Sequence, residues 1–235
     1  MKRLLMILKR NVIYLPDIIF RLFWYSRKND RHSKQEKYNF IRKISYKAIN
    51  KGNLLVKVYG SSNLPEENGF IFYPNHQGVF DGFAIVYACD IPFSPVIKKE
   101  LMDKSIVKQT FACLESLPMN RQDIRQSMKI INEVANRVKR KENCLIFAEG
   151  TRSNSNNLNE FKAGSFKAAY KSKCPIIPVA LINSFLPFDE NNDEPVIVQV
   201  HFLKPIYYDE YCNKKTNEIA MMVQQQIQTV INDYS

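Results

Sequence analysis

The stretch "FIFYPNHQGVFDG", residues 70–82, joins a short apolar run to a histidine, a glycine and an aspartate. The first five residues are typical of a buried strand, which Pro74 and Asn75 end. Polar side chains that directly follow such a strand lie at the edge of the sheet, where α/β proteins usually place their sites. The stretch therefore predicts an α/β fold with a site that contains His76 and Asp81.

His76 and Asp81 are five residues apart. On one continuous helix they would lie about 140° apart around the axis and could not pair. We expect the chain to turn at Gln77 and Gly78, with Asp81 in the first turn of a following helix, so that the two side chains meet. An imidazole with a carboxylate partner can act as a general base. A structural histidine beside a helix-capping aspartate is the alternative.

Other short apolar runs predict the remaining strands of the sheet. The predicted strands cover residues 54–60, 70–74, 93–98, 144–150, 175–182 and 196–202. Apolar residues at helical spacing predict helices over 122–140 and from Ile219 to Ile231, and the basic stretch 37–50 could form a further helix. Because strands alternate with helices, we expect an α/β fold in which helices flank a mixed, mostly parallel sheet.

The net charge of +11 is concentrated in residues 1–50, which hold 13 Lys and Arg residues against 3 Asp and Glu residues. Charged residues interrupt every apolar run here before it reaches the ~20 residues that cross a bilayer. Apolar side chains gather on one helical face, and Pro16 divides the helix. That face holds Leu4, Leu8, Val12, Leu15, Ile19 and Leu22. We expect residues 1–50 to form an amphipathic helical element on an anionic lipid surface and residues 51–235 to form the main domain. A core helix with a solvated charged face is the alternative.

Several classes of site have no pattern in this sequence. The seven glycines form neither GxGxxG nor GxxxxGK[ST], and no GxSxG motif is present. Three scattered histidines and five cysteines without a CxxC pair predict reduced thiols and no metal site. We expect no cofactor, and no nucleic acid partner because no binding module is recognisable.

Basic residues near the ends of other predicted strands, including a further short strand just before Arg121, could bind an anion. In "FAEGTRSNS" (147–155), the backbone of Glu149, Gly150 and Thr151 and the guanidinium of Arg152 would be available to a phosphate. Arg121 ends "LPMNR" (117–121), and Lys98 lies in "VIKKEL" (96–101). Each cation alone is equally consistent with an ordinary surface position. Together they predict one base beside several anion-binding groups.

These blocks, in this order, resemble the four motifs of the glycerolipid acyltransferases. NHxxxxD, KxEL, a proline–apolar–x–Arg block, FxEGTRS and an apolar PVA block succeed one another within about residues 54–182, and "FKAGSFKAAY" (161–170) is also similar to that family. The bacterial lysophosphatidate acyltransferases are most similar. The sequence departs from the family at Ala148, where proline is usual, and at Asn120, where aspartate is usual.

The resemblance implies an acyltransferase domain over residues 51–235. His76, held by Asp81, would deprotonate the sn-2 hydroxyl of lysophosphatidate, which takes an acyl group from acyl-CoA or acyl-carrier protein and gives phosphatidate in phospholipid biosynthesis. Lys98, Arg121, Arg152 and the backbone of Glu149–Thr151 would bind the acceptor's phosphate. The expected location is the cytoplasmic face of the cell membrane, as a peripheral or monotopic protein. Another lysolipid acceptor, such as a lyso-ornithine lipid, and a non-catalytic membrane-surface protein are the alternatives.

Overall fold

The computed structural model describes residues 2–27, 31–191 and 193–234. Within them, one sheet has the strand order β1-β7-β6-β2-β5-β3-β4. The strands are β1 (Leu54–Tyr59), β2 (Ile71–Pro74), β3 (Phe93–Lys98), β4 (Leu117–Met119), β5 (Asn143–Leu145), β6 (Ile176–Ile182) and β7 (Val196–Phe202). Neighbouring strands in this described part run parallel except β6 and β7, which are antiparallel. The predicted mixed, mostly parallel sheet is confirmed.

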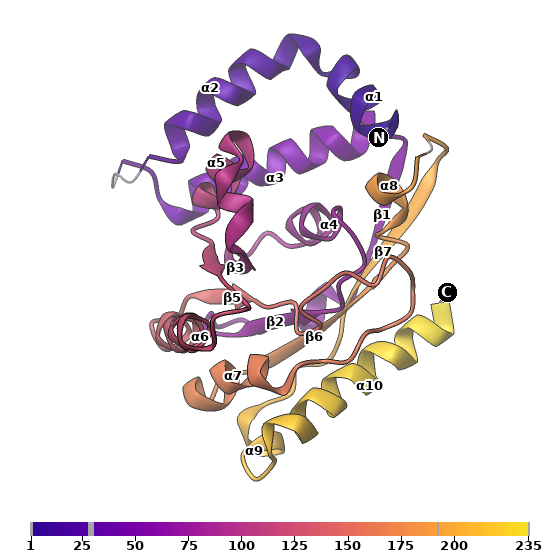
Figure 1. The fold of residues 1–235 in the computed structure, drawn as a ribbon. Coiled ribbons are helices and arrows are strands. Elements are labelled where there is room, and N and C mark those ends of the chain that lie inside the picture. Colours follow the sequence, from indigo (N-terminus) through magenta and orange to yellow (C-terminus); the bar gives the residue numbers. More distant parts are fainter. Residues whose placement is uncertain (1, 28–30, 192, 235) are drawn as a thin grey trace.

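Helices cover both faces of the sheet (Figure 1). One side carries α1 (Lys2–Arg10), α2 (Leu15–Tyr25), α3 (Lys34–Lys51), α4 (Asp81–Ala88) and α5 (Ser105–Cys113). The other carries α6 (Ile124–Lys139), α7 (Lys167–Ser172), α9 (Tyr208–Tyr211) and α10 (Thr216–Tyr234). The short α8 (Leu186–Asp189) follows β6, and single 3₁₀ turns are η1 (Val12–Tyr14), η2 (Ser61–Asn63), η3 (Lys99–Asp103) and η4 (Ala163–Phe166).

Two apolar clusters lie on the two faces of the sheet. Successive side chains of a strand point to opposite faces, so Phe72 of β2 joins the cluster under α3 and α4, while Ile71 and Tyr73 join the cluster under α6 and α10. Both faces of the central strand are therefore buried, which is why its sequence is continuously apolar.

Two predicted boundaries differ from the structure. The predicted strand 144–150 ends at Leu145, because Phe147 leaves the sheet and Gly150 donates its N–H to the Phe147 carbonyl at 3.2 Å, closing a turn. Gly150 adopts a φ of 73°, which a strand does not allow. The predicted helix 37–50 begins earlier, at Lys34, because Ser33 and Glu36 form a capping box at its start.

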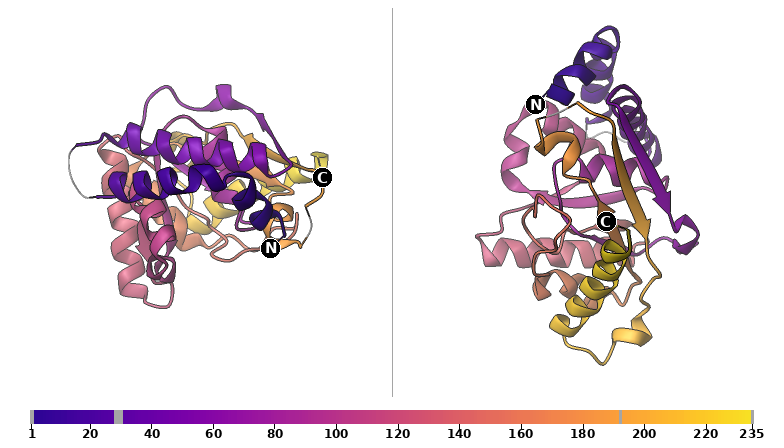
Figure 2. Two further views of the ribbon diagram at one scale, coloured as in Figure 1. Left: turned by 90° about the horizontal axis from the view of Figure 1, so that it is seen from above. Right: turned by 90° about the vertical axis from the view of Figure 1, so that its right-hand side faces the viewer.

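The first helices divide near Pro16 as expected, since η1 separates α1 from α2 and Pro16 lies in the first turn of α2. Both helices lie outside α3 (Figure 2). In the predicted apolar face, Leu22 is buried, whereas Leu4 and Val12 are exposed. α3 itself supplies Tyr38, Ile41 and Ile49 to the core. Among the described helices, none combines the length and the apolar character that crossing a bilayer requires.

Candidate active site

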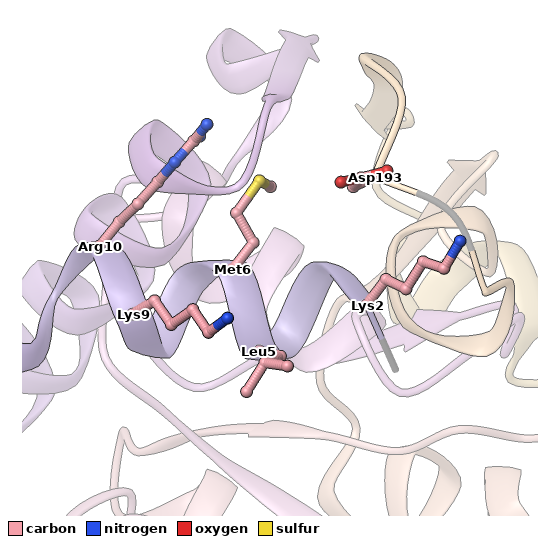
Figure 3. A pocket seen from close by; sticks show the side chains of 6 residues that line it. All are labelled: Lys2, Leu5, Met6, Lys9, Arg10 and Asp193. Atoms are coloured by element: carbon pink, nitrogen blue, oxygen red, sulfur yellow. The ribbon is translucent and has the colours of Figure 1, made fainter.

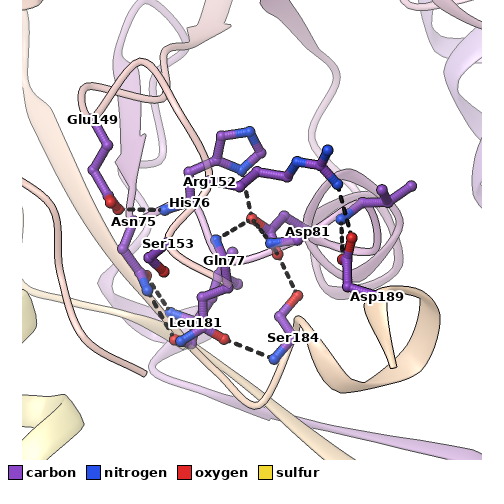
Figure 4. A network of polar contacts seen from close by, with 12 residues as sticks. Asn75, His76, Gln77, Asp81, Glu149, Arg152, Ser153, Leu181, Ser184 and Asp189 are labelled. Carbon is purple, nitrogen blue, oxygen red and sulfur yellow. Dashed lines mark hydrogen bonds and ion pairs between the residues drawn. The ribbon is translucent and has the colours of Figure 1, made fainter. Parts of the chain in front are cut away.

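His76 and Asp81 meet at the carboxyl end of β2. His76 Nδ1 lies 2.7 Å from Asp81 Oδ2, because the chain turns after His76 and α4 starts at Asp81 (Figure 4). The Asp81 side chain is 1% exposed and also accepts hydrogen bonds from Gln77 N (2.7 Å), Gly78 N (3.0 Å) and Ser184 Oγ (2.6 Å). A buried carboxylate with four donors is fixed in one orientation.

This arrangement selects one tautomer of His76. The Asp81 carboxylate can only accept hydrogen bonds. His76 Nδ1 therefore carries the proton and donates a hydrogen bond to Asp81, and Nε2 keeps its lone pair. The imidazole stacks on Phe147, with ring centroids 4.1 Å apart and planes inclined by 26°, and its side chain is 19% exposed. In Figure 4 the second ring nitrogen points away from Asp81. Nε2 is therefore the atom that can accept a proton from a ligand.

The loop after β5 surrounds the backbone of His76. Glu149 Oε1 accepts the His76 N–H at 2.6 Å, and Ser153 N donates to the His76 carbonyl at 2.8 Å. Glu149 Oε2 accepts the Asn159 N–H at 2.9 Å. Burial raises the pKa of the Glu149 carboxyl above its ordinary value. The Glu149 carboxylate thus binds the backbone N–H groups of His76 and Asn159. Only the backbone of Glu149 is left for the expected phosphate contact.

The same loop gathers two of the three predicted cations. Arg152 Nη1 pairs with Asp189 Oδ1 at 2.8 Å, and Arg121 Nη1 donates to the carbonyl of Gly150. Lys98 ends β3 at the same edge of the sheet, where its Nζ lies 3.6 Å from Glu100 Oε1. The side chains of Arg152 and Lys98 are 43% and 59% exposed, so both cations are open to a ligand.

Two backbone donors beside these cations are unused. In the chain as described, the N–H groups of Thr151 and Arg152 have no hydrogen-bond partner. Gly150 precedes them in the left-handed region, a conformation that turns successive N–H groups toward one side. Such a concave group of amides can bind an anion.

Sequence reasoning missed the residues that support this site from behind. Gln77 is fully buried; its Nε2 donates to Asn156 Oδ1 at 2.9 Å and its Oε1 accepts the Ser184 N–H at 2.7 Å. Because Gln77 directly follows His76, its position in the sequence could have indicated that it supports the site. Ser184 and Asp189 follow β6, more than 100 residues along the chain from His76, and only the fold brings them to Asp81 and Arg152.

The sequence of this region matches a known family. The sequence model of the Acyltransferase family fits residues 55–182, which include every predicted site residue. The chain belongs to the Acyltransferase family. Within this acyltransferase, the matched segment begins in β1 and ends with β6.

Individual members of the family are only moderately similar to this chain in sequence. It is 30% identical to a Salmonella typhimurium protein named 1-acyl-sn-glycerol-3-phosphate acyltransferase, over 64% of this chain and 62% of that protein. A Cocos nucifera protein of the same name is 27% identical, over 73% of this chain and 58% of its own length. This acyltransferase thus spans about 60% of the curated relatives it matches.

A solved structure has the same fold. The 1-acyl-sn-glycerophosphate acyltransferase PlsC from Thermotoga maritima superimposes with a TM-score of 0.81, covering 98% of this chain and 95% of that one at 21% identity. The similarity extends beyond residues 55–182 and includes most of the amino-terminal helices and α10 of this acyltransferase.

Proposed function

We propose that this protein transfers an acyl group from acyl-CoA or acyl-carrier protein to the sn-2 hydroxyl of lysophosphatidate. One observation carries the proposal: Nε2 of the His76–Asp81 pair is free, and the loop that donates to the His76 carbonyl carries Arg152, two unused N–H groups and a carbonyl bonded to Arg121. A base next to an anion site fits an acceptor that has both a hydroxyl and a phosphate. The relatives' name gives this acceptor, 1-acyl-sn-glycerol-3-phosphate, and acyl transfer.

In the proposed mechanism, His76 Nε2 removes the hydroxyl proton of the acceptor, and the oxygen attacks the thioester carbonyl. A C–O bond forms and the C–S bond breaks. The thiolate that leaves takes the proton back from the imidazolium. Because the acceptor oxygen attacks the thioester directly, no acyl-enzyme forms. Asp81 stabilises the imidazolium while it exists, because its carboxylate lies 2.7 Å from Nδ1.

The phosphate of the acceptor would lie against Arg152, Arg121 and Lys98. A guanidinium offers several N–H donors in a plane and binds phosphate bidentately. The unused amides of Thr151 and Arg152 add two neutral donors on the same loop. The amides of Gln77 and Gly78 already donate to Asp81, and the Val79 amide donates to Asp189 at 2.9 Å. Donors for the oxyanion therefore have to come from groups other than these three amides.

The acceptor and the product are membrane lipids, and the first two helices are suited to a bilayer. Exposed apolar residues on them are Leu4, Leu5, Leu8, Val12, Ile13, Tyr14, Ile19, Phe20, Phe23 and Trp24. A groove of about 410 Å³ along α1 adds basic groups at this surface (Figure 3). It is lined by Lys2, Leu5, Met6, Lys9, Arg10 and Asp193. We propose peripheral docking on the cytoplasmic face of the cell membrane, where basic residues attract anionic lipid.

Acyl transfer by purified protein in mixed micelles tests the proposal. Lysophosphatidate and a long-chain acyl-CoA or acyl-carrier protein are supplied, and phosphatidate is measured. Wild-type protein should form phosphatidate, and His76→Ala should lower the rate by about 10²- to 10⁴-fold.

If the folded wild-type protein acylates lyso-ornithine lipid or another lysolipid but leaves lysophosphatidate unchanged, the proposed acceptor is wrong and that lysolipid takes its place. Absence of transfer to every lysolipid with both donors would favour a non-catalytic membrane-surface protein. Equal rates for wild type and His76→Ala would remove His76 from the chemistry.

A further inference from the structure

Asp189 brings a third carboxylate to the site, after Asp81 and Glu149, from outside the matched motifs. It ends α8, seven residues beyond β6. Its Oδ1 accepts from Arg152 Nη1 at 2.8 Å, and its Oδ2 accepts the Val79 N–H at 2.9 Å (Figure 4). One side chain thus contacts both the cation proposed for phosphate and the turn between His76 and Asp81.

The element that carries Asp189 is firmly placed. The Phe188 ring lies edge-on to Phe80 and Phe83 of the α4 region, with centroid distances of 5.4 and 6.0 Å. The carbonyl of Pro187 accepts a hydrogen bond from Arg3 Nε at 3.1 Å. A group held on packed structure can orient a partner more accurately than one on a free loop.

The Arg152–Asp189 pair is too exposed to stabilise the fold much, since the side chains are 43% and 20% exposed. Its effect on orientation is larger. An arginine side chain is long and has many rotamers, and the carboxylate limits it to those in which Nη1 faces α8. The other N–H groups of the guanidinium stay available for an anion.

We propose that Asp189 is a positioning residue for acyl transfer, which holds the Arg152 guanidinium toward the acceptor's phosphate and holds the Val79 amide in the turn that joins His76 to Asp81. This inference rests on the proposed function for the identity of the acceptor. It assigns to a single carboxylate the alignment of the anion site with the base.

A carboxylate near an anion site also repels the anion, so the opposite outcome is physically reasonable. If repulsion outweighed orientation, removing the charge of Asp189 would strengthen acceptor binding. Geometry favours orientation, because the carboxylate contacts the guanidinium directly at 2.8 Å, whereas an anion on the other N–H groups would lie farther from the carboxylate and be better screened from it.

Steady-state kinetics on Asp189→Asn and Asp189→Ala separate the two contacts. The asparagine oxygen can still accept the Val79 N–H, but the amide cannot pair with the guanidinium. We expect Asp189→Asn to raise KM for lysophosphatidate by about tenfold, the effect of one charge-assisted hydrogen bond, and to change kcat by less than about twofold. Asp189→Ala should also lower kcat, because the turn at Val79 loses its anchor.

Glu67→Gln is the matched control, since Glu67 is a surface acid paired with Lys141 at 2.7 Å and its loss changes the net charge equally. In an Arg152→Ala background, Asp189→Asn should cause no further rise in KM. An unchanged or lower KM for Asp189→Asn, or an effect that adds fully to Arg152→Ala, would overturn the proposal.

Binding of inorganic phosphate, followed by the NMR signals of the arginine side chains, keeps the test independent of turnover. Asp189→Asn and Arg152→Ala should both weaken phosphate binding, by similar factors. If that holds while the wild type transfers no acyl group, the proposed function fails, and only the orientation of the Arg152 guanidinium by Asp189 stands. If the wild type is active and Asp189→Asn binds phosphate as tightly as the wild type, the role of Asp189 fails alone.

Discussion

Gly78 allows α8 to approach the turn between His76 and Asp81. A Cβ at this position would lie 2.4 Å from Asp189 Oδ2 and 2.8 Å from the Cα of Phe185. Gly78 is not among the glycines with positive φ, which are Gly60, Gly69 and Gly150. The glycine was expected to give the turn its flexibility, and the structure gives a different reason, because it leaves room for a neighbouring backbone.

Gly78→Ala should therefore act like the loss of Asp189. The methyl group would push the backbone at Phe185 and the Asp189 carboxylate away, and we expect a higher KM for the acceptor, a lower kcat and a lower melting temperature. Gly82→Ala is the control, since a Cβ at Gly82, in α4, meets no atom within 4 Å. Alanine there should stabilise the protein by about 0.5–1 kcal/mol through helix propensity. Kinetics that are equal for the two variants would show that the close approach at Gly78 is unimportant.

Residues close together in sequence were the predictable part of the site. His76 and Asp81 belong to one short stretch, so their pairing followed from a strand end and a helix start. The partners of Arg152 and Asp81 did not follow, because Asp189 lies 37 residues beyond Arg152 and Ser184 lies 103 residues beyond Asp81. No periodicity relates such positions, and only the antiparallel return of β7 after β6 and the packing of α8 define them.

Among the elements, β5 and α8 mark the limit of pattern reasoning. Long runs such as β6 and β7 and periodic helices such as α6 and α10 matched their predicted ranges closely. The apolar run 144–147 continues past the end of β5, because Phe147 stacks on the His76 ring instead of pairing in the sheet. α8 has four residues, too few to show a helical period.

The pair of helices α1 and α2 carries the prediction about membranes. Ile13 is 85% exposed and Phe20 is 67% exposed, and burying such side chains in the headgroup region is favourable. The double variant Ile13→Ser/Phe20→Ser should bind anionic phospholipid vesicles at least about tenfold more weakly in a sedimentation assay. Met221→Ser, at an exposed apolar position of α10, is the control and should bind like the wild type.

Deletion of residues 1–48 would be a poorer test, because it would also remove the core residues Tyr38 and Ile41 of α3. If the double variant and the wild type bind vesicles equally, docking takes place through another surface.

Across the whole molecule, Arg3 connects the first helix to three distant parts of the chain. Its side chain is fully buried and donates to the carbonyls of Gly52 at 2.6 Å, Glu194 at 2.6 Å and Pro187 at 3.1 Å. Burial lowers the pKa of this guanidinium. The residue lies in the basic amphipathic stretch, and the sequence pattern does not predict that this one charge is buried.

Arg3→Met should destabilise the protein by about 3 kcal/mol or more, because a methionine fills the space but leaves buried carbonyls without donors. Urea denaturation measures the change. Arg21→Met is the control, since Arg21 is an exposed residue paired with Asp17 on the surface of α2, and its loss should leave the denaturation midpoint unchanged. A midpoint for Arg3→Met equal to that of the wild type would mean that water replaces the lost donors without cost.

The anchoring of α1 by Arg3 has a geometric consequence for the proposed docking on a bilayer. Since α1 is fastened to Pro187, two residues from Asp189, the docking helices and the reacting imidazole keep one fixed separation. The protein cannot lower its site into the leaflet as a tethered domain could. In the proposed reaction, each lipid acceptor would have to rise to the height that the fold sets, and withdrawing its hydrocarbon from the leaflet would add to the activation barrier.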